Sequence, residues 1–379
     1  MARSSWGSKR QKGKGAWELR WRENGEPKSE MFHGSARAAD GRLAVIRVRV
    51  EGASKLPAPA DMTLSTFFWG VFVPECELRM VPGGNNKALA RTTYEGYIRY
   101  YDNHIEPAFG DVMMREIRAR DVQDWLMGMT AGAAKHALAV FKVVMNRAEA
   151  LEYLEHHPLN KRYILPVRTT GRGRTQDRYS ADELRDIYAE CEGQWWRPLY
   201  ILAAFGGAQR AEACGVQAPE IEWEEDGNGL WGVVPVKRGV HLIKGEVVVE
   251  ERGKNEERED FLIVPPPYSL GLASAVAEVL ARGGTWLVDD GFGGPIDPEA
   301  MTRAWQRWLG GTSHRYVPYG NLRNSYSTML HALGLEDSLV SKLMRHANLT
   351  TDYTHYNRIS PQEKIALLGE KLGACGKGL

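Results

Sequence analysis

Side chains able to act as a nucleophile, as cations and as hydrogen-bond donors follow one another in the C-terminal third of the chain. Arg323 lies in the segment NLRNSY, His346 lies in the segment LMRHANLTT, and Tyr356 follows about ten residues after His346. A tyrosine hydroxyl can form a covalent intermediate. Guanidinium groups stabilise the negative charge that a phosphate gains in a transition state. The series therefore has the residue types that phosphodiester exchange through a tyrosine needs.

The order and spacing of these segments resemble the tyrosine-recombinase (phage-integrase) family. Its pattern is an H-x-x-R box, an L-x-x-H turn, and a tyrosine about ten residues beyond that histidine. Residues 203–212 (AAFGGAQRAE) look like the family's first-arginine box, in which Arg and Glu sit three positions apart. Residues 247–264 look like its β-hairpin, with Lys254 in the turn where the family places a catalytic lysine. Lys244 is the alternative for that place.

The resemblance implies a role for each matched residue. Tyr356 is the expected nucleophile, which forms a 3′-phosphotyrosyl link and frees a 5′-hydroxyl. Lys254 is the expected general acid for the leaving oxygen, and Arg323 is an activating cation. His346 is a phosphate hydrogen-bond donor, and Glu212 orients its neighbours. No metal and no nucleotide cofactor is required by this chemistry.

Structural alternatives remain for the same residues. Tyr356 could be an ordinary packed tyrosine, and so could Tyr353. As a nucleophile, Tyr353 lies too close to His346 for the usual spacing. Arg323 then forms a surface ion pair, and His346 caps a helix. A basic hairpin turn at Lys254 serves only solvation.

Two positions depart from the family pattern. Alignment through Glu212 puts Gln209 where the family has its first catalytic arginine, and Arg210 lies one residue further, about 100° around a helix. Gly320 occupies the first place of the H-x-x-R box and offers no side chain there. Losing one charged donor at a transition-state phosphate costs on the order of 10²–10³ in rate. Either Arg210 therefore turns into the site, or the enzyme is slow or inactive.

These residues must be positioned by helices and strands, and the sequence predicts a multidomain chain that is mainly α. We expect a small β-sheet domain over residues 1–58, a helical core-site DNA-binding domain over 62–165, and a mixed α+β catalytic domain over 175–379. Prolines and small residues at 53–60 indicate a linker between the first two domains. A basic connector at 168–174 precedes the third domain.

The catalytic domain is predicted to be mainly helical with a strand-rich interruption. Ser180 followed by a glutamate three residues later is typical of a helix start. Strands are predicted at 230–236, 246–250 and 261–264.

The N-terminal segment is strongly basic. Residues 1–58 carry thirteen Lys and Arg against six Asp and Glu, so their formal charge of +7 is balanced by −6 in the rest. Period-two alternation predicts a strand at 16–21, followed by a strand at 28–32 and a helix at 36–48. A sheet with Trp and Arg on one face suits a DNA groove, and equally a minidomain without ligand. By resemblance this is the arm-site DNA-binding domain, whose DNA-binding candidates are Lys9, Arg10, Lys12, Lys14, Arg20 and Arg22.

The tail indicates assembly. Residues 360–363 (SPQE) combine a capping box with proline at the first helical position, and an apolar stretch follows. The resemblance implies that this helix docks into a neighbouring subunit, and a helix packed on its own chain is the alternative. It also implies double-stranded DNA attachment sites as partner, a homotetramer on DNA, and an accessory DNA-bending protein or excisionase.

Composition excludes several classes of protein. Hydrophobic residues make up 43% and charged residues 26%, which is typical of a globular protein, and no segment has the roughly 18 consecutive apolar residues of a membrane span. Four scattered cysteines fit neither metal nor disulfide spacing and indicate reduced thiols in a cytoplasmic protein. The resemblance to DNA recombinases implies that the protein is associated with the nucleoid. Three hypotheses follow: an active recombinase, a degraded integrase that still binds DNA, and a DNA-binding regulator whose C-terminal domain only oligomerises.

Overall fold

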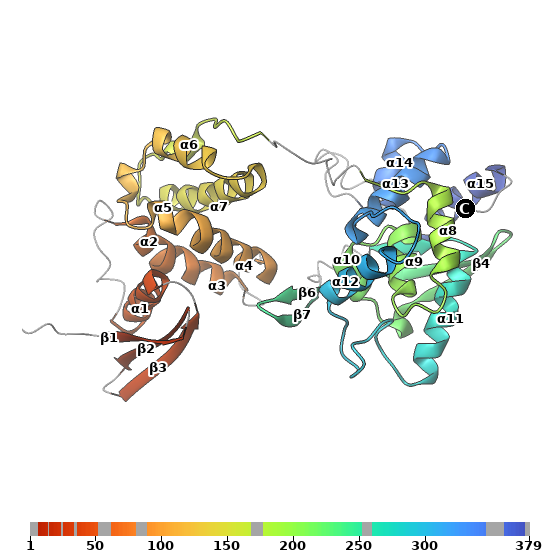
Figure 1. Ribbon diagram of the computed structural model, residues 1–379, viewed down its shortest axis with the longest axis horizontal. Coiled ribbons are helices and arrows are strands. Elements are labelled where there is room, and N and C mark those ends of the chain that lie inside the picture. The colour runs from red at the N-terminus through yellow and green to blue at the C-terminus, as the bar shows by residue number, and fades with distance from the viewer. Residues whose placement is uncertain are drawn as a thin grey trace, which may run out of the picture. The chain divides into compact units, whose positions relative to one another are not determined.

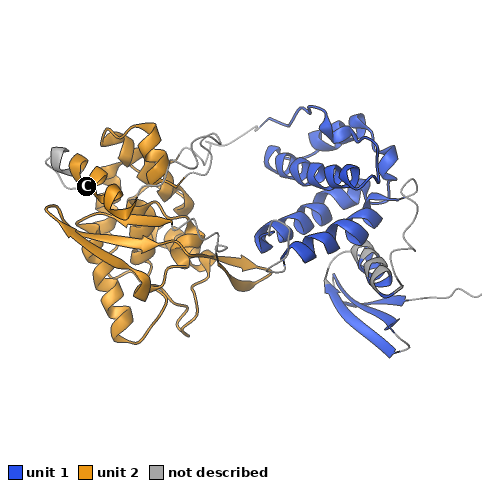
Figure 2. Cartoon of the chain, turned by 180° about the vertical axis from the view of Figure 1, so that it is seen from behind, with its two compact units in different colours: residues 1–170 blue, residues 171–379 orange. Residues whose placement is uncertain are grey.

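The computed structural model describes residues 7–13, 15–23, 26–33, 36–51, 62–80, 89–167, 177–251, 260–345 and 360–375. Contacts divide the chain into two units, Met1–Thr170 and Gly171–Leu379 (Figure 2). The fold is mainly helical with small antiparallel sheets, which confirms the predicted fold class (Figure 1). The first unit contains both predicted N-terminal domains, and its division at the 53–60 linker stays a prediction.

A three-stranded antiparallel sheet begins the first unit. The strands β1 (Gly7–Gly13), β2 (Ala16–Glu23) and β3 (Glu26–His33) lie in that order, and α1 (Ala36–Glu51) follows. The two predicted strands and the predicted helix are confirmed. Strand β1 was not predicted, because its sequence GSKRQKG has no apolar residue to alternate. It is placed by pairing with β2, from Gly7 opposite Trp21 to Gly13 opposite Ala16.

The predicted grouping of Trp and Arg on one face of this sheet is wrong. Leu19 and Trp21 are buried in a small core with Ala39 of α1, whereas Arg20 and Arg22 are exposed. Successive side chains of a strand point to opposite faces. The alternation of apolar and basic residues along β2 therefore puts the tryptophan against α1 and the arginines on the other face.

The rest of the first unit is a helical bundle. Its helical segments are α2 (Leu64–Phe67), η3 (Phe68–Phe72), α3 (Val73–Met80), α4 (Arg91–Tyr100), η4 (Tyr101–Ile105), α5 (Glu106–Phe109), η5 (Met114–Glu116), α6 (Ala119–Met127), α7 (Ala131–Ala150) and η6 (Pro158–Asn160). Phe68 stacks on Tyr101 with ring centroids 3.5 Å apart in its core. Arg42 of α1 pairs with Glu30 of β3 at 2.8 Å and with Glu77 of α3 at 3.7 Å. This arginine therefore ties the sheet domain to the bundle.

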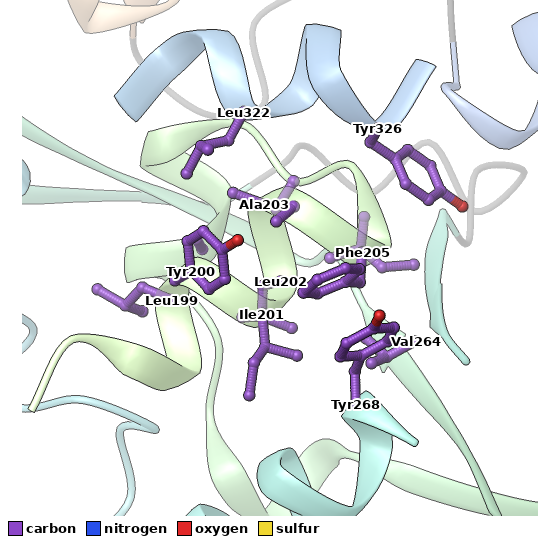
Figure 3. Close-up of a cluster of buried hydrophobic side chains, with 14 of the residues drawn as sticks. Leu199, Tyr200, Ile201, Leu202, Ala203, Phe205, Val264, Tyr268, Leu322 and Tyr326 are labelled. Carbon is purple, nitrogen blue, oxygen red and sulfur yellow. The ribbon is translucent and has the colours of Figure 1, made fainter. Parts of the chain in front are cut away.

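The second unit has a central buried helix. Its helices are α8 (Ala181–Glu190), α9 (Arg197–Gly206), α10 (Arg210–Cys214), η7 (Ala218–Glu220), α11 (Tyr268–Ala281), α12 (Pro298–Leu309), η8 (Tyr319–Asn321), α13 (Leu322–Ala332), α14 (Asp337–Leu343) and α15 (Pro361–Cys375). Residues 199–206 of α9 are all buried. Figure 3 shows Leu322 and Tyr326 of α13 on one side of α9, and Val264 and Tyr268 on another. Because α9 is packed on both sides, its C-terminal end and the neighbouring helix α13 are held in fixed positions.

The predicted hairpin at residues 247–264 does not form. Strand β7 (Glu246–Glu251) pairs with β6 (Arg238–Ile243), whereas β8 (Phe261–Val264) pairs with β5 (Gly229–Pro235), which also pairs with β4 (Glu222–Asp226). The turn of the β6–β7 hairpin is Lys244-Gly245, with φ of 52° and 86°. Two residues with positive φ form the tight turn that matches strand twist. Lys244 therefore sits in a hairpin turn, and Lys254 lies outside the described residues.

Helix α15 packs on its own chain. Ile365 and Leu368 join the core of the second unit, and the Gln362 side chain donates to Glu224 of β4 at 3.0 Å. The predicted capping box is confirmed: the Ser360 amide donates to the Glu363 carboxylate, and the Glu363 amide donates to the Ser360 hydroxyl. This is the second of the two arrangements expected for the tail, and docking into a neighbouring subunit stays a prediction.

Among the described residues, no helix is long and apolar enough to cross a membrane. Cys76, Cys191 and Cys214 are buried free thiols. Burial raises the pKa of Cys76 to about 11 and the pKa of Cys191 and Cys214 to about 12. These three thiols are therefore protonated at neutral pH and belong to the core.

Candidate active site

The candidate site begins at the C-terminal end of α9. Gly207 ends this helix with φ of 71°, a left-handed conformation that glycine adopts without strain. A Cβ atom at this position would lie 2.6 Å from Cδ1 of Tyr326 on α13. Only glycine therefore permits both the turn and the close approach of α13. The same turn directs the Gly207 carbonyl oxygen toward α13, where it accepts a hydrogen bond from Nη1 of Arg323.

Arg323 is half-buried near the start of α13. Besides the bond to Gly207, its Nη2 atom donates to the carbonyl oxygen of Met344, the residue that ends α14. The guanidinium group is planar and carries five donors in a fixed geometry. Arg323 therefore holds three segments in place: the α9–α10 turn, the start of α13, and the end of α14.

Glu212 lies inside the first turn of α10 and is 4% exposed. Its Oε2 atom accepts from the backbone amide of Gln209 at 2.9 Å, so the carboxylate caps the helix. Gln209, which occupies the family's first-arginine position, is exposed. The carboxylate therefore fixes the backbone at Gln209, and the orienting role of Glu212 in catalysis stays a prediction.

Arg210 points to a different element. Its Nη1 atom donates to Oγ1 of Thr302 at 2.7 Å and pairs with Oε1 of Glu299 at 3.0 Å, both on α12. Arg210 and Glu299 are partly exposed, at 37% and 42%. The catalytic role of Arg210 stays a prediction, and it requires the guanidinium to leave these two partners.

Arg345 is the residue that sequence reasoning missed. Its Nη2 atom lies 2.6 Å from the same Oε2 atom of Glu212 that caps α10, and the Arg345 side chain is 4% exposed. Arg345 follows α14 with φ of 56°, an uncommon conformation for a residue other than glycine. Two further donors of this side chain, Nε and Nη1, are buried without a hydrogen-bond partner among the described residues. Its position immediately before His346 was the available signal.

Tyr326 is a buried tyrosine of α13, three residues after Arg323. It is 2% exposed and packs on Gly207. Burial raises the pKa of its hydroxyl, while the positive charges of Arg345 and Arg323 act in the opposite direction. A packed, protonated phenol of this kind suits a structural role and leaves the nucleophile to another residue.

Other predicted site residues are placed only in part. Gly320 lies exposed in η8, and a Cβ atom there would meet no atom within 4 Å. The position is therefore open, and glycine is not required by packing. Lys254, His346 and Tyr356 lie outside the described residues, so their predicted roles rest on the sequence.

The basic residues of the N-terminal sheet divide between its faces. Lys9 faces α1, where it pairs with Asp40 and lies over the Trp17 ring. Arg10 is directly opposite Glu18 on the other face, and Glu18 also pairs with Lys12 and Arg20. A surface depression is lined by Gly7, Ser8, Glu18, Arg20, Trp21, Arg22, Pro27, Lys28 and Ser29. Lys14 is outside the described residues.

Comparisons with known proteins agree on one family. Residues 86–130 match the model of the phage integrase N-terminal SAM-like domain. A "Tyrosine recombinase XerC-like" protein from Caldanaerobacter subterraneus subsp. tengcongensis is 22% identical over 310 residues, which cover 74% of this chain and 76% of that protein. The chain is therefore similar to phage integrases and tyrosine recombinases.

Solved integrase structures share the fold of this chain. The Tn1549 transposon integrase in complex with transposon right-end DNA matches with a TM-score of 0.59 at 13% identity, covering 82% of this chain and 100% of that one. A lambda integrase tetramer bound to a Holliday junction matches with a TM-score of 0.51 at 15% identity, covering 93% and 98%.

Proposed function

We propose that this protein is a tyrosine recombinase, namely a site-specific integrase that cleaves and rejoins double-stranded DNA of a mobile element through a 3′-phosphotyrosyl intermediate. The observation that carries the proposal is the hydrogen bond from Arg323 to Gly207. It joins the candidate activating cation on α13 to the first-arginine box at the α9–α10 turn, 116 positions away in sequence. A scaffold that gathers donors from these two segments suits the binding of a phosphate whose charge increases in the transition state.

The proposed reaction exchanges one phosphodiester for another. The Tyr356 hydroxyl gives up its proton to water and attacks the scissile phosphorus, a bond from the tyrosine oxygen to phosphorus forms, and the bond to the 5′-oxygen breaks. Lys254 donates the proton that the leaving 5′-oxygen takes up. His346 and Arg323 donate hydrogen bonds to the phosphate oxygens. Rejoining is the reverse reaction with a new 5′-hydroxyl, so the bond energy is kept and no cofactor is consumed.

The proposed partner is double-stranded DNA with attachment sites. The relatives of known structure are DNA complexes, and one of them is a tetramer on a Holliday junction. A homotetramer on paired sites and an accessory DNA-bending protein or excisionase are proposed on the same ground. The face of the N-terminal sheet that carries Arg10, Arg20 and Arg22 is the proposed arm-site surface, because phosphate contacts need exposed cations.

A second candidate function is that of a degraded integrase that binds DNA and no longer cleaves it. Two observations favour it. Gln209 supplies no charge at the first-arginine position, and Gly320 supplies no side chain at the start of the H-x-x-R box. The regulator hypothesis, in which the C-terminal domain only oligomerises, shares this expectation of no cleavage.

Covalent trapping separates these functions. A nicked suicide substrate with the element's own junction sequence is incubated with wild type, Tyr356→Phe and Tyr353→Phe, and adducts are resolved on denaturing gels. We expect an adduct in wild type and in Tyr353→Phe that is absent in Tyr356→Phe. An adduct lost with Tyr353→Phe instead would reassign the nucleophile. DNA binding by wild type without any adduct would favour the degraded integrase.

A further inference from the structure

We propose that Arg345 supplies to the scissile phosphate the positive charge that Gln209 lacks. The inference rests on the proposed function and adds a catalytic residue to it. Arg345 and Gln209 meet at one atom: Oε2 of Glu212 accepts from Nη2 of Arg345 at 2.6 Å and from the Gln209 amide at 2.9 Å. The guanidinium group of Arg345 is therefore two hydrogen bonds away from the residue at the first-arginine position.

The unused donors of Arg345 point to a ligand. Its side chain is 4% exposed, yet Nε and Nη1 have no hydrogen-bond partner in the described part of the chain. Buried polar groups are almost always paired, and an unpaired charged group is costly. One side of the guanidinium group is fixed by Glu212, which leaves the other donors for an anion. A phosphate is the anion whose geometry matches paired guanidinium donors.

The backbone at Arg345 is consistent with a functional constraint. Its φ of 56° lies in the left-handed region, where glycine is the residue without strain. Strained non-glycine residues persist where the surrounding structure holds them, and they cluster at active sites. Glycine at this position would relieve the backbone, so the sequence keeps an arginine against the local conformational preference.

The second cation of the site lies next to Arg345. Arg323 donates through Nη2 to the carbonyl oxygen of Met344, the residue that precedes Arg345. The two guanidinium groups thus approach the site from α13 and from the turn after α14. Arg210, the nearest sequence alternative, is engaged by Glu299 and Thr302 on α12. Within the described residues, Arg345 is therefore the cation positioned to take the place that Gln209 leaves neutral.

A relocated charge can be tested by moving it back. We would measure single-turnover adduct formation on the suicide substrate for wild type, Tyr356→Phe, Gln209→Arg, Arg345→Gly and the double variant Arg345→Gly with Gln209→Arg. Glycine suits the backbone at position 345, so the single variant retains the turn. We expect Arg345→Gly to be on the order of 10²–10³ slower. The double variant is expected to form the adduct at least about tenfold faster than Arg345→Gly, because it restores a guanidinium at the first-arginine position.

A second substrate separates a catalytic role from a structural one. A methylphosphonate at the scissile position replaces a charged oxygen by a methyl group, so the phosphate cation becomes dispensable. We expect the Arg345→Gly defect to shrink to less than about tenfold on this substrate. The Tyr356→Phe defect is expected to remain complete, because the nucleophile is still missing. Arg315→Ala, which removes an exposed arginine paired with Glu183, is the control for loss of an ion pair.

The outcomes distinguish the two proposals. Wild-type cleavage that depends on Tyr356, with Arg345→Gly within threefold of wild type, would overturn the role of Arg345 and leave the proposed function standing. Equal losses on both substrates without recovery in the double variant would make the Glu212–Arg345 pair structural only. If wild type forms no Tyr356-dependent adduct but Gln209→Arg does, two proposals are overturned. These are cleavage by the wild-type protein and the supply of the missing positive charge by Arg345. Thermal melting of each variant checks that the proteins whose cleavage rates are compared are folded. Arg345→Lys is a second probe, because it keeps a positive charge but removes the guanidinium group.

Discussion

The Nη2 atom of Arg345 lies 2.6 Å from the Oε2 atom of Glu212, and both side chains are 4% exposed. The pair joins the turn after α14 to the first turn of α10, across 133 positions of sequence. Breaking a buried pair from one side leaves the other charge without compensation in a medium of low dielectric constant. The contact therefore couples the stability of the second unit to the geometry of the candidate active site.

Glu212→Ala is expected to lower the free energy of unfolding by about 3–5 kcal/mol, because it leaves Arg345 buried and unpaired. It also removes the cap of α10. Urea unfolding followed by circular dichroism measures the change. Glu299→Ala is the matched control, since it breaks the partly exposed Arg210 pair and should cost less than about 1 kcal/mol. Similar losses in the two variants would contradict the burial argument.

Gly207→Ala should disrupt the α9–α13 contact. The substitution introduces strain at a positive φ and places a Cβ atom 2.6 Å from Cδ1 of Tyr326. Gly193→Ala isolates the contact, because Gly193 has φ of 76° but nothing within 4 Å of its Cβ position. We expect Gly207→Ala to be less stable than Gly193→Ala by about 1–3 kcal/mol, the usual cost of overpacking. Equal melting temperatures would show that α13 shifts without penalty.

Lys364 of α15 predicts a pH dependence of stability. Burial lowers the pKa of its ammonium group to about 8, the charge of Arg345 acts in the same direction, and Asp260 opposes it. Between this value and the usual 10.5 the unfolded state binds more protons than the folded state, so stability rises with pH. The cost of burying the charge is complete below pH 8 and absent above 10.5, and amounts to roughly 3 kcal/mol at most.

Urea unfolding at pH 7 and pH 10 tests this expectation. Wild type should gain stability relative to Lys364→Met between the two values, since methionine fills the same space without a charge to lose. The Lys364 ammonium also donates to the carbonyl oxygen of Phe261 at 3.0 Å, a contact that the variant removes at both pH values. A difference between the proteins that stays constant with pH would assign the titration to another group.

Arg210 and Arg345 make opposite predictions for cleavage. If Arg210 supplies the first cation, Arg210→Ala should slow adduct formation by on the order of 10²–10³. Because its guanidinium group is bound to Glu299 and Thr302, we expect a defect at least about tenfold smaller than that of Arg345→Gly. Single-turnover rates of the two variants under identical conditions decide the matter. A larger defect in Arg210→Ala would show that the residue leaves α12 when DNA binds.

The proposed arm-site surface predicts a change in salt dependence. Each phosphate contact contributes about 0.9 to the slope of log affinity against log salt concentration. Arg10→Ala removes an exposed cation from the outer face of the sheet, so its slope should fall by about one such unit on arm-site DNA. Lys9→Met is the control, because Lys9 is turned toward Asp40 and Trp17 on the opposite face. An equal change in both variants would argue against a face-specific contact.

Local sequence patterns determined much of this protein. The alternation along β2, the capping boxes at Ser180 and Ser360, and the apolar spacing of α7 each express a preference within a few neighbouring residues. The mainly helical class was therefore predicted from the chain alone. The motifs that contain Arg323 and Glu212 also gave the resemblance to tyrosine recombinases.

Only the tertiary structure decided which distant residues meet. Strand β8 pairs with β5 and β7 pairs with β6, because the Lys244-Gly245 turn closes a separate hairpin within what looked like one strand pair. Strand β1 has no apolar pattern and forms through pairing with β2. The Arg345–Glu212 contact depends on how α14 packs relative to α10. No local preference encodes such a contact, since it arises from burial of the whole core around α9.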